Sequence, residues 1–139
     1  MKAAIAHDCV GALLVRDGRV LLGRRADDRA WLPGAWDVFG GHLEPGEDAV
    51  DALHRELAEE LGVAPLALRD LGMLEDAASG SWRLRVYAVT AWRGEARNRQ
   101  PDEHAELRWC TPVEAAERLA SAHPGFERLI AAAVAASGR

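Results

Sequence analysis

Residues 41–63 read GHLEPGEDAVDALHRELAEELGV. Apolar residues recur at helical spacing over residues 47–61, Glu47 to Leu61, so we expect a helix there. Gly62 follows the last periodic residue, which is where a C-capping glycine belongs. Pro45-Gly46 closes the turn before the helix. The stretch is therefore expected to form a turn, a helix and a glycine cap.

Three carboxylates share one side of this helix. At about 100° of rotation per residue, Glu59 and Glu60 lie roughly 60° and 40° to either side of Glu56. Arg55 lies beside Glu59 and is expected to hold a carboxylate through a bidentate ion pair. The apolar face that should pack against a sheet lies next to the carboxylates and consists of Val50, Leu53, Leu57 and Leu61. The carboxylates therefore flank the packed face and do not point away from the protein.

Clustered carboxylates need a positive partner, because each close pair of like charges costs about 1 kcal/mol in water and more where solvent is excluded. One arginine does not balance three glutamates. A hard divalent cation such as Mg²⁺ accepts carboxylate ligands, grips phosphates and lowers the pKa of a bound water. Taken alone, such an acidic run is most often a solvated helix face.

A fixed pattern favours the metal-binding interpretation. It is G-x5-E-x7-R-E-U-x-E-E-x-G-U, with U a bulky aliphatic residue, and a chance match is on the order of 10⁻⁸. Its positions are Gly41, Glu47, Arg55, Glu56, Leu57, Glu59, Glu60, Gly62 and Val63. On this pattern, which has no departure here, the chain resembles the MutT/Nudix hydrolase family.

The resemblance implies roles for the residues of the pattern. Glu56, Glu59 and Glu60 would bind Mg²⁺ or Mn²⁺, and the carbonyl of Gly40, which precedes the pattern, is a further candidate ligand. The family varies in whether the position of Glu56 binds metal or is the base that activates water, and both roles stay open. Arg55 would orient the glutamates during catalysis. Structural roles fall to Gly41, Glu47 and Gly62, with a second metal site as an alternative for Glu47.

Family members often add a carboxylate from the loop before the last strand, about six residues ahead of a Trp. Glu103 stands at that spacing from Trp109 and is a candidate metal ligand. The alternative is an ordinary exposed loop residue beside Asp102. His104 is interpreted as a loop histidine, and none of the five histidines has metal-ligand spacing.

The residues that would choose the substrate are outside the pattern. ADP-ribose and diadenosine-polyphosphate members tend to carry a Pro or a Tyr where this chain has Ala78 and Ser79. Arg24-Arg25 resembles the (d)NTP-cleaving members, and Arg25 matches a position that contacts base or phosphates. Members specific for 8-oxoguanine carry an Asn where this chain has Ala122, so strict specificity for oxidised guanine is not expected.

Two further features bear on the base pocket. Phe39-Gly40-Gly41 replaces the usual Pro-Gly-Gly of the family, which alters the floor of the pocket. Trp31, Trp36 and Trp82 are candidates for stacking on a nucleobase, with packing in the core or at its rim as the alternative.

The rest of the chain alternates between strand and helix patterns. We expect strands at residues 9–15, 19–22, 36–43, 67–75, 81–92 and 107–110, a hairpin at Asp17-Gly18, a turn at residues 78–80, a loop at residues 94–101 and closing helices at residues 112–120 and 124–136. This order predicts a mixed sheet between helices, an α/β class that agrees with the family's α/β/α sandwich. Residues 1–139 are taken as one domain.

Composition and net charge limit the kinds of binding partner and compartment that the sequence predicts. The net charge of −5 argues against a protein that coats nucleic acid. No apolar run reaches the length of a membrane span. Cys9 and Cys110 have no CxxC spacing and are interpreted as buried thiols in a reducing, cytoplasmic compartment, not as a disulfide. The sequence does not indicate an oligomeric state.

These observations together predict a Mg²⁺-dependent hydrolase of a pyrophosphate bond in a nucleotide-type small molecule, most simply a (d)NTP that yields NMP and pyrophosphate. One alternative is another nucleoside diphosphate derivative, such as a nucleotide sugar or ADP-ribose. A second is a nucleotide sensor that binds without cutting, which loss of the glutamates would favour, yet all are present. A third is an isoprenoid diphosphate isomerase, but its extra Cys and Glu positions are not recognisable here.

Overall fold

The computed structural model describes residues 7–76 and 81–138, so the turn expected at Ala78–Gly80 lies outside the described residues. The elements are β1 (His7–Arg16), β2 (Arg19–Arg25), β3 (Trp36–Asp37), β4 (Phe39–His42), α1 (Ala49–Leu61), β5 (Ala64–Glu75), β6 (Trp82–Arg93), β7 (His104–Cys110), α2 (Pro112–Leu119) and α3 (Phe126–Ser137). In the described part of the chain, no helix has the length and apolar character needed to cross a membrane.

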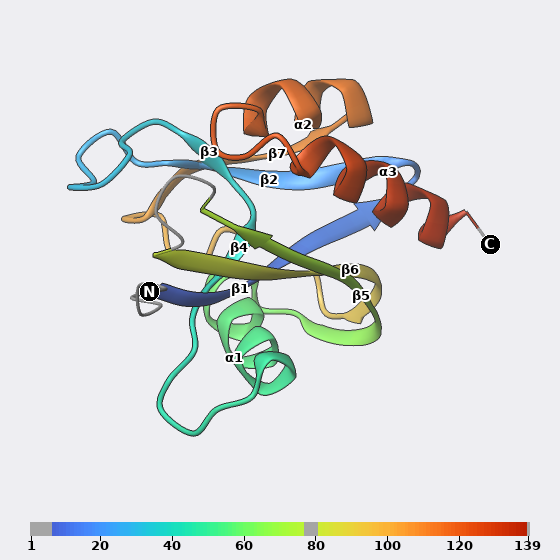
Figure 1. Ribbon diagram of the computed structural model, residues 1–139, viewed down its shortest axis with the longest axis horizontal. Helices are drawn as coiled ribbons and strands as arrows, with labels where there is room; N and C mark the ends of the chain where they lie inside the picture. Colours follow the sequence, from blue (N-terminus) through green and yellow to red (C-terminus); the bar gives the residue numbers. More distant parts are fainter. Residues whose placement is uncertain (1–6, 77–80, 139) are drawn as a thin grey trace, which may run out of the picture.

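A mixed sheet lies between helices on its two sides, as the sequence predicts (Figure 1). Its main path is β3-β2-β1-β6-β5, with β4 added on β1 and β7 added on β2. β1 pairs parallel with β6 and antiparallel with both β2 and β4. In the view of Figure 1, α1 lies below the sheet and α2 and α3 lie above it.

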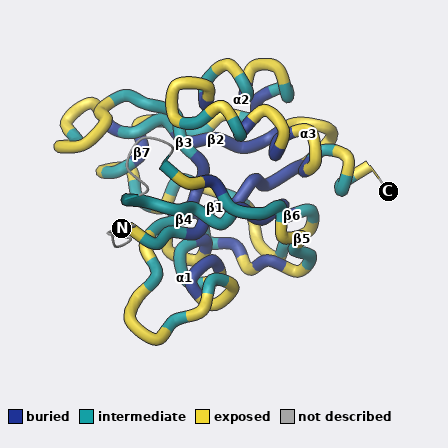
Figure 2. Tube along the Cα trace, viewed as in Figure 1, coloured by how far each residue is buried: buried dark blue, intermediate teal, exposed yellow. Residues whose placement is uncertain are grey.

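The core has two halves because successive side chains of a strand point to opposite faces of the sheet. In β1, Val10, Ala12 and Leu14 pack on the α1 side, whereas Leu13 and Val15 pack on the side of α2 and α3. The buried parts of the trace follow these central strands (Figure 2). Burial on both faces explains the nearly continuous apolar run of β1 in the sequence.

The β1–β2 hairpin forms at the predicted turn. Asp17 and Gly18 both have positive φ, 53° and 73°, which is the conformation that a two-residue hairpin requires. The hairpin pairs Arg16 with Arg19 and Val15 with Val20.

The two cysteines are free thiols, with Cys110 buried and Cys9 half-buried.

The strand expected at residues 36–43 is wrong in one respect, because the structure divides it into β3 and β4. The backbone N–H of Val38, between them, donates to the side chain of Asp37 at 2.8 Å. β3 then pairs with β2, whereas β4 pairs with β1. The chain therefore crosses from one strand to another at Val38, which places Gly40 and Gly41 beside the middle of β1.

Several element ends differ from the expected ones. α1 begins at Ala49, since Asp48 is its N-cap and accepts the N–H of Asp51. Val50, expected on the packed face, is 39% exposed. β7 begins at His104, three residues before the expected Leu107, because its pairing with β2 extends to Arg25.

Candidate functional site

Helix α1 sets the burial of its three carboxylates. The exposed fraction of the side chain is 7% for Glu60, 16% for Glu56 and 51% for Glu59. Glu60 lies on the side of Glu56 that is next to the packed leucine face, and Glu59 lies on the side of Glu56 away from that face. The helix therefore presents one buried, one half-buried and one exposed carboxylate along the same edge.

Arg55 holds the N-terminal part of this group. Its Nε and Nη2 donate to the two carboxylate oxygens of Glu47 at 2.9 and 2.8 Å, and Nη1 donates to Glu56 at 2.9 Å. Nη2 also donates to the carbonyl of His42 at 3.1 Å. The bidentate partner is thus Glu47 and not Glu59, whose nearest oxygen is 3.8 Å from Arg55. The arginine fixes the turn before α1 and orients Glu56 at the same time.

The two glycines of β4 make room for the glutamates. A Cβ on Gly41 would lie 2.7 Å from Glu56 Oε1, so only a glycine leaves space for that carboxylate. Gly40 has φ 147°, and a Cβ there would overlap the carbonyl of Val10. Its N–H donates to Glu60 Oε2 at 2.8 Å. The close approach of β4 to β1 therefore depends on Gly40, and the space for Glu56 of α1 depends on Gly41.

The C-terminal end of α1 is tied to the loop before β7. The backbone N–H groups of Arg97 and Arg99 donate to the carbonyls of Leu61 and Glu60 at 3.1 and 3.0 Å. These are helix-end carbonyls that have no partner within the helix itself. Gly62 has φ 72°, and a Cβ there would meet the side chain of Arg99 at 2.8 Å. The glycine cap therefore ends the helix and also seats the loop that leads to Glu103.

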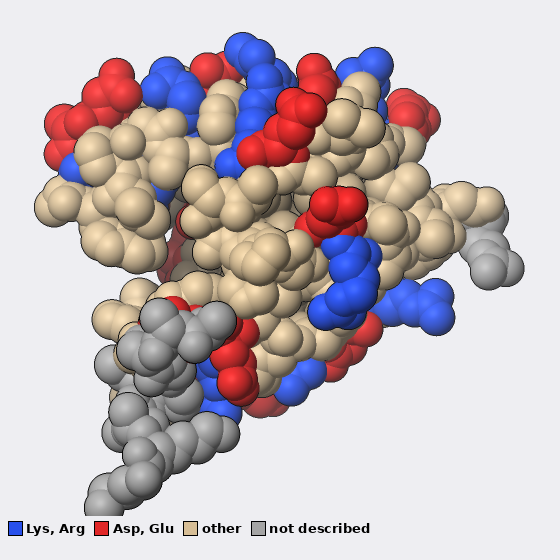
Figure 3. Space-filling view, turned by 45° about the horizontal axis from the view of Figure 1, so that its top comes forward, with Lys and Arg blue, Asp and Glu red and all other residues tan. Residues whose placement is uncertain are grey.

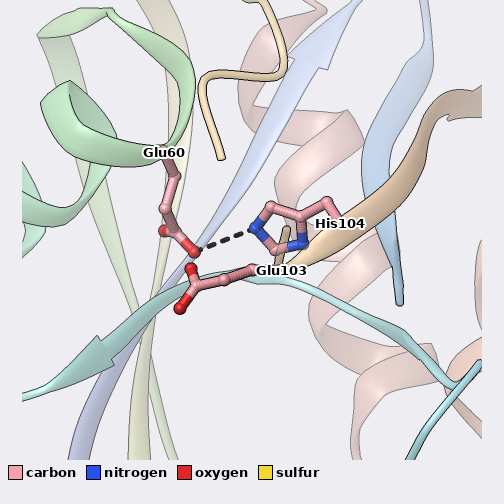
Figure 4. Close-up of side chains that lie close together, drawn as sticks. All are labelled: Glu60, Glu103 and His104. Carbon is pink, nitrogen blue, oxygen red and sulfur yellow. Dashed lines mark hydrogen bonds and ion pairs between the residues drawn. The ribbon is translucent and has the colours of Figure 1, made fainter. Parts of the chain in front are cut away.

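Glu103 and His104 meet Glu60 at this end of the helix. One ligand atom from each of the three residues lies within 4.8 Å of the others. Figure 4 shows the three side chains close together. Glu103 also accepts a hydrogen bond from Arg29, with Nη1 at 3.1 Å from Oε1. The charge of Glu103 contributes to the raised pKa of Glu56, so this loop carboxylate lies near the carboxylates of α1.

The electrostatics of the cluster favour a bound cation. Burial raises the pKa of Glu60 to about 7, although His104 and the N–H of Gly40 favour its charged form. Burial also raises the pKa of Glu56, against the opposing effect of Arg55. Several carboxylate oxygens with incomplete compensation are the donor set that a hard divalent cation accepts. The residues present therefore fit such an ion.

The substrate candidates fall in different places. Arg25, at the end of β2, donates from Nε to the carbonyl of Trp31 at 2.9 Å, and its guanidinium lies 5.4 Å from the Trp31 ring. Trp31 is 65% exposed, on the same loop as Arg29. Trp36 instead lies against Arg108 and Arg118, and Trp82 contacts His123, so both have packing partners.

Ala122 lies in the turn between α2 and α3, where its N–H donates to the carbonyl of Leu119 at 3.0 Å. Its methyl group offers no hydrogen bond to a base. On the face of the molecule in Figure 3, basic and acidic side chains are interspersed and do not gather into one basic surface.

Sequence reasoning missed two contacts of the site. His104 is buried, not a loop histidine, and its Nε2 lies 3.3 Å from Glu60 Oε1. Arg29, which was not singled out, pairs with Glu103. The available signal for His104 was its place next to Glu103 at the start of an alternating strand pattern.

Comparison with known proteins agrees with this architecture. The NUDIX domain model matches residues 6–132. A CTP pyrophosphohydrolase of Escherichia coli K12 is 36% identical over 111 residues, 78% of each chain. A putative 8-oxo-dGTP diphosphatase 2 of Mycobacterium tuberculosis is 40% identical over 107 residues, which are 76% of this chain and 73% of that protein.

A solved structure supports the same conclusion. The crystal structure of a MutT NUDIX hydrolase from Burkholderia pseudomallei superposes with a TM-score of 0.70 at 38% identity, over 78% of this chain and 84% of that one. Sequence pattern, fold and relatives agree, and the chain therefore belongs to the MutT/Nudix family, as an enzyme that acts on acid anhydrides.

Proposed function

We propose that this Nudix enzyme hydrolyses a nucleoside triphosphate to the monophosphate and pyrophosphate, with Mg²⁺ as the cation and Mn²⁺ as a substitute. The observation that carries the proposal is the meeting of Glu60 and Glu103 from distant parts of the sequence, beside Glu56. Carboxylates that come together only in the folded chain support a specific cation site more strongly than an acidic helix face does.

Glu56, Glu59, Glu60 and Glu103 would hold the cation, and the carbonyl of Gly40 is a further candidate ligand. A bound Mg²⁺ would neutralise charge on the diphosphate and acidify the attacking water. Catalysis of phosphoryl transfer is chiefly positioning and charge stabilisation, so the rigidity of these side chains matters most.

Glu56 is the preferred base among these carboxylates. It is half-buried, its pKa is raised by burial, and Arg55 Nη1 fixes Oε1 at 2.9 Å. These features keep one carboxylate oriented while its affinity for a proton is increased, which suits it to accept the proton of the attacking water. Arg55 acts through Glu56 and Glu47 and is a positioning residue in this scheme.

The triphosphate preference rests on two supports. The relatives above are named for CTP and for 8-oxo-dGTP, both nucleoside triphosphates. Arg25 and Trp31 lie on β2 and the loop that follows it, and that loop also carries Arg29, which contacts Glu103. A cation and an exposed aromatic ring joined to the loop that reaches Glu103 through Arg29 suit a nucleotide whose phosphates reach the carboxylates.

The deciding experiment is a substrate screen with purified protein. Nucleoside triphosphates, nucleotide sugars, dinucleotides and ADP-ribose are incubated with Mg²⁺, with Mn²⁺ or with EDTA, and released phosphate and pyrophosphate are measured. We expect pyrophosphate from triphosphates, loss of turnover in EDTA and recovery on adding Mg²⁺. Full activity in EDTA would contradict the metal-dependent mechanism, and release of phosphate alone would contradict the assigned products.

A further inference from the structure

His104 is the least expected residue of the acidic cluster. It is the first residue of β7, and it is 8% exposed. Among the described residues, the only other buried polar or charged residue is Glu60, and the two are in contact (Figure 4). The sequence pattern of the helix gives no role to this buried imidazole in contact with a buried carboxylate.

The imidazole ring is fixed on several sides. Phe39 contacts it edge-on, with ring centroids 5.4 Å apart. Gly23 of β2 lies so close that a Cβ there would be 3.2 Å from Nδ1. The backbone is held as well, because the N–H of His104 donates to the carbonyl of Gln100 at 3.0 Å, and its carbonyl accepts from the side chain of Asn98 at 2.8 Å. The ring therefore has little freedom to turn away from Glu60.

The two ring nitrogens have different surroundings. Nε2 lies 3.3 Å from Glu60 Oε1, whereas Nδ1 is buried without a hydrogen-bond partner in the part of the chain that the structure describes. An ionised carboxylate only accepts hydrogen bonds, so the contact with the ionised form of Glu60 requires a proton on Nε2. A proton on Nδ1 would be a buried donor without an acceptor. The neutral ring with hydrogen on Nε2 satisfies both conditions.

We propose that His104 is a positioning residue, which donates Nε2–H to Glu60 Oε1 and holds that carboxylate ready for the cation. Gly40 donates to the other oxygen, Oε2, at 2.8 Å. With one donor on each oxygen, the carboxylate plane is fixed, and its remaining lone pairs are available to an ion. The inference rests on the proposed metal-dependent function and adds a residue to it.

Substitutions at position 104 separate the donor from the bulk of the ring. His104→Gln places an amide N–H near the position of Nε2, whereas His104→Asn is too short to reach Glu60. His104→Phe keeps an aromatic ring against Phe39 but has no donor. Loss of a group that orients a metal ligand typically lowers metal affinity by about 10- to 100-fold.

Mn²⁺ affinity is measured by calorimetry and by electron paramagnetic resonance, without substrate. We expect at least a tenfold loss for His104→Asn and His104→Phe, and a loss within about threefold for His104→Gln. The exposed His54→Gln on α1 is the control and should bind as the parent protein does. Unchanged affinity in His104→Asn would overturn the proposal, and this variant keeps the test valid where the Phe variant does not fold.

The tautomer is read separately by ¹⁵N NMR of histidine-labelled protein at pH 8, above the pKa of Glu60, first without metal and then with Mg²⁺. The expected spectrum has hydrogen on Nε2 of His104 in both states. Loss of that hydrogen on metal addition would make His104 a direct ligand and overturn its positioning role, as would hydrogen on Nδ1 in the metal-free protein. Because this measurement needs no turnover, it is independent of the substrate screen, and a failure of the proposed function would be recognised by its own test.

Discussion

The two ends of helix α1 treat their carboxylates in opposite ways. At the N-terminal end, Glu47 receives two hydrogen bonds from Arg55, which lowers the pKa of Glu47 to about 2. At the C-terminal end, Glu60 is buried beside Glu103, and burial raises its pKa to about 7. The turn before α1 thus carries a carboxylate whose cationic partner the protein supplies, and the last turn of α1 carries a carboxylate without one.

We propose that this difference separates acids with a structural role from acids with a functional one. The Glu47 pair is complete in the protein itself, so it fixes the turn before α1 at any ionic composition. Glu60 has two hydrogen-bond donors but lies among further acids, and a buried charge in that position is unfavourable without a cation. We therefore expect substitution of Glu60 to impair catalysis and substitution of Glu47 to lower stability.

The first prediction compares Glu60→Gln with Glu47→Gln. Removing the charge of Glu60 should lower kcat by about 100-fold or more, the loss that follows removal of a charge-stabilising group in an active site. Glu47→Gln leaves Arg55 with a weaker partner, so it should lower the melting temperature and change kcat far less. Steady-state kinetics with saturating Mg²⁺ and thermal unfolding in EDTA measure both effects. Equal kcat losses in the two variants would remove the distinction.

The second prediction concerns the pH dependence of unfolding without metal. The pKa of Glu60 rises from an ordinary 4.5 to about 7 on folding, so protonated Glu60 favours the folded state. Its stabilising contribution is complete below pH 4.5 and is lost as pH rises through 7. The shift corresponds to a loss on the order of 3 kcal/mol.

Urea unfolding of the parent protein and of Glu60→Gln in EDTA measures this contribution as a difference. The variant should gain relative stability between pH 4.5 and pH 8, because it has no carboxylate to ionise. Added Mg²⁺ should stabilise the parent protein most at pH 8, where Glu60 is ionised. A stability difference that stays constant over this pH range would contradict the uncompensated charge at this end of α1.

The acids of α1 could be predicted from the sequence, whereas the partners of Glu60 could not. Glu56, Glu59, Glu60 and the cap at Gly62 follow from helical spacing, which is a local property of residues 41–63. Periodicity gave the direction of the packed face, but not that the first turn, with Val50, would stay exposed. Local patterns therefore predicted the helix and its acids well.

The partners of Glu60 depend on pairing between distant strands. β7 extends back to His104 because β2 continues to Arg25 through an irregularity between Arg24 and Arg25. Neither the bulge nor the seating of residues 97–99 on the end of α1 has a spacing signal in the sequence. The contact between His104 and Glu60 is therefore a product of the tertiary fold, and a sequence pattern could only place it beside Glu103.

The third prediction tests whether Glu103 belongs to the uncompensated group. Arg29 contacts it in the structure, so its charge is partly balanced, and a smaller effect than for Glu60 is expected. Glu103→Gln should lower kcat by about tenfold, or roughly 1.4 kcal/mol. The exposed neighbour Asp102→Asn is the matched control and should change little. Small and equal effects on kcat would return Glu103 to the role of an ordinary loop residue.

The fourth prediction, with the smallest effect, concerns the nucleotide base. By the family resemblance, Ala122 is proposed to replace an Asn that recognises oxidised guanine. One hydrogen bond contributes about 0.5–1.5 kcal/mol net. We therefore expect less than about a tenfold preference for 8-oxo-dGTP over dGTP in kcat/KM. Paired substrates at equal concentration, followed by product separation, measure this ratio directly. A preference well above tenfold would show that another residue reads the oxidised base.

Arg25→Ala belongs to the same test, since it removes a cation near the acidic cluster without touching a carboxylate. A contact made equally in the ground state and the transition state affects binding more than chemistry, so KM for triphosphates should rise more than kcat falls. Arg25 also holds the carbonyl of Trp31, and Trp31→Ala separates stacking from charge. If ADP-ribose or a nucleotide sugar exceeded every triphosphate tenfold in kcat/KM, the substrate class would change. The contrast between the two ends of α1 would remain, because it depends on the partners of Glu47 and the burial of Glu60 and not on the group attached to the diphosphate.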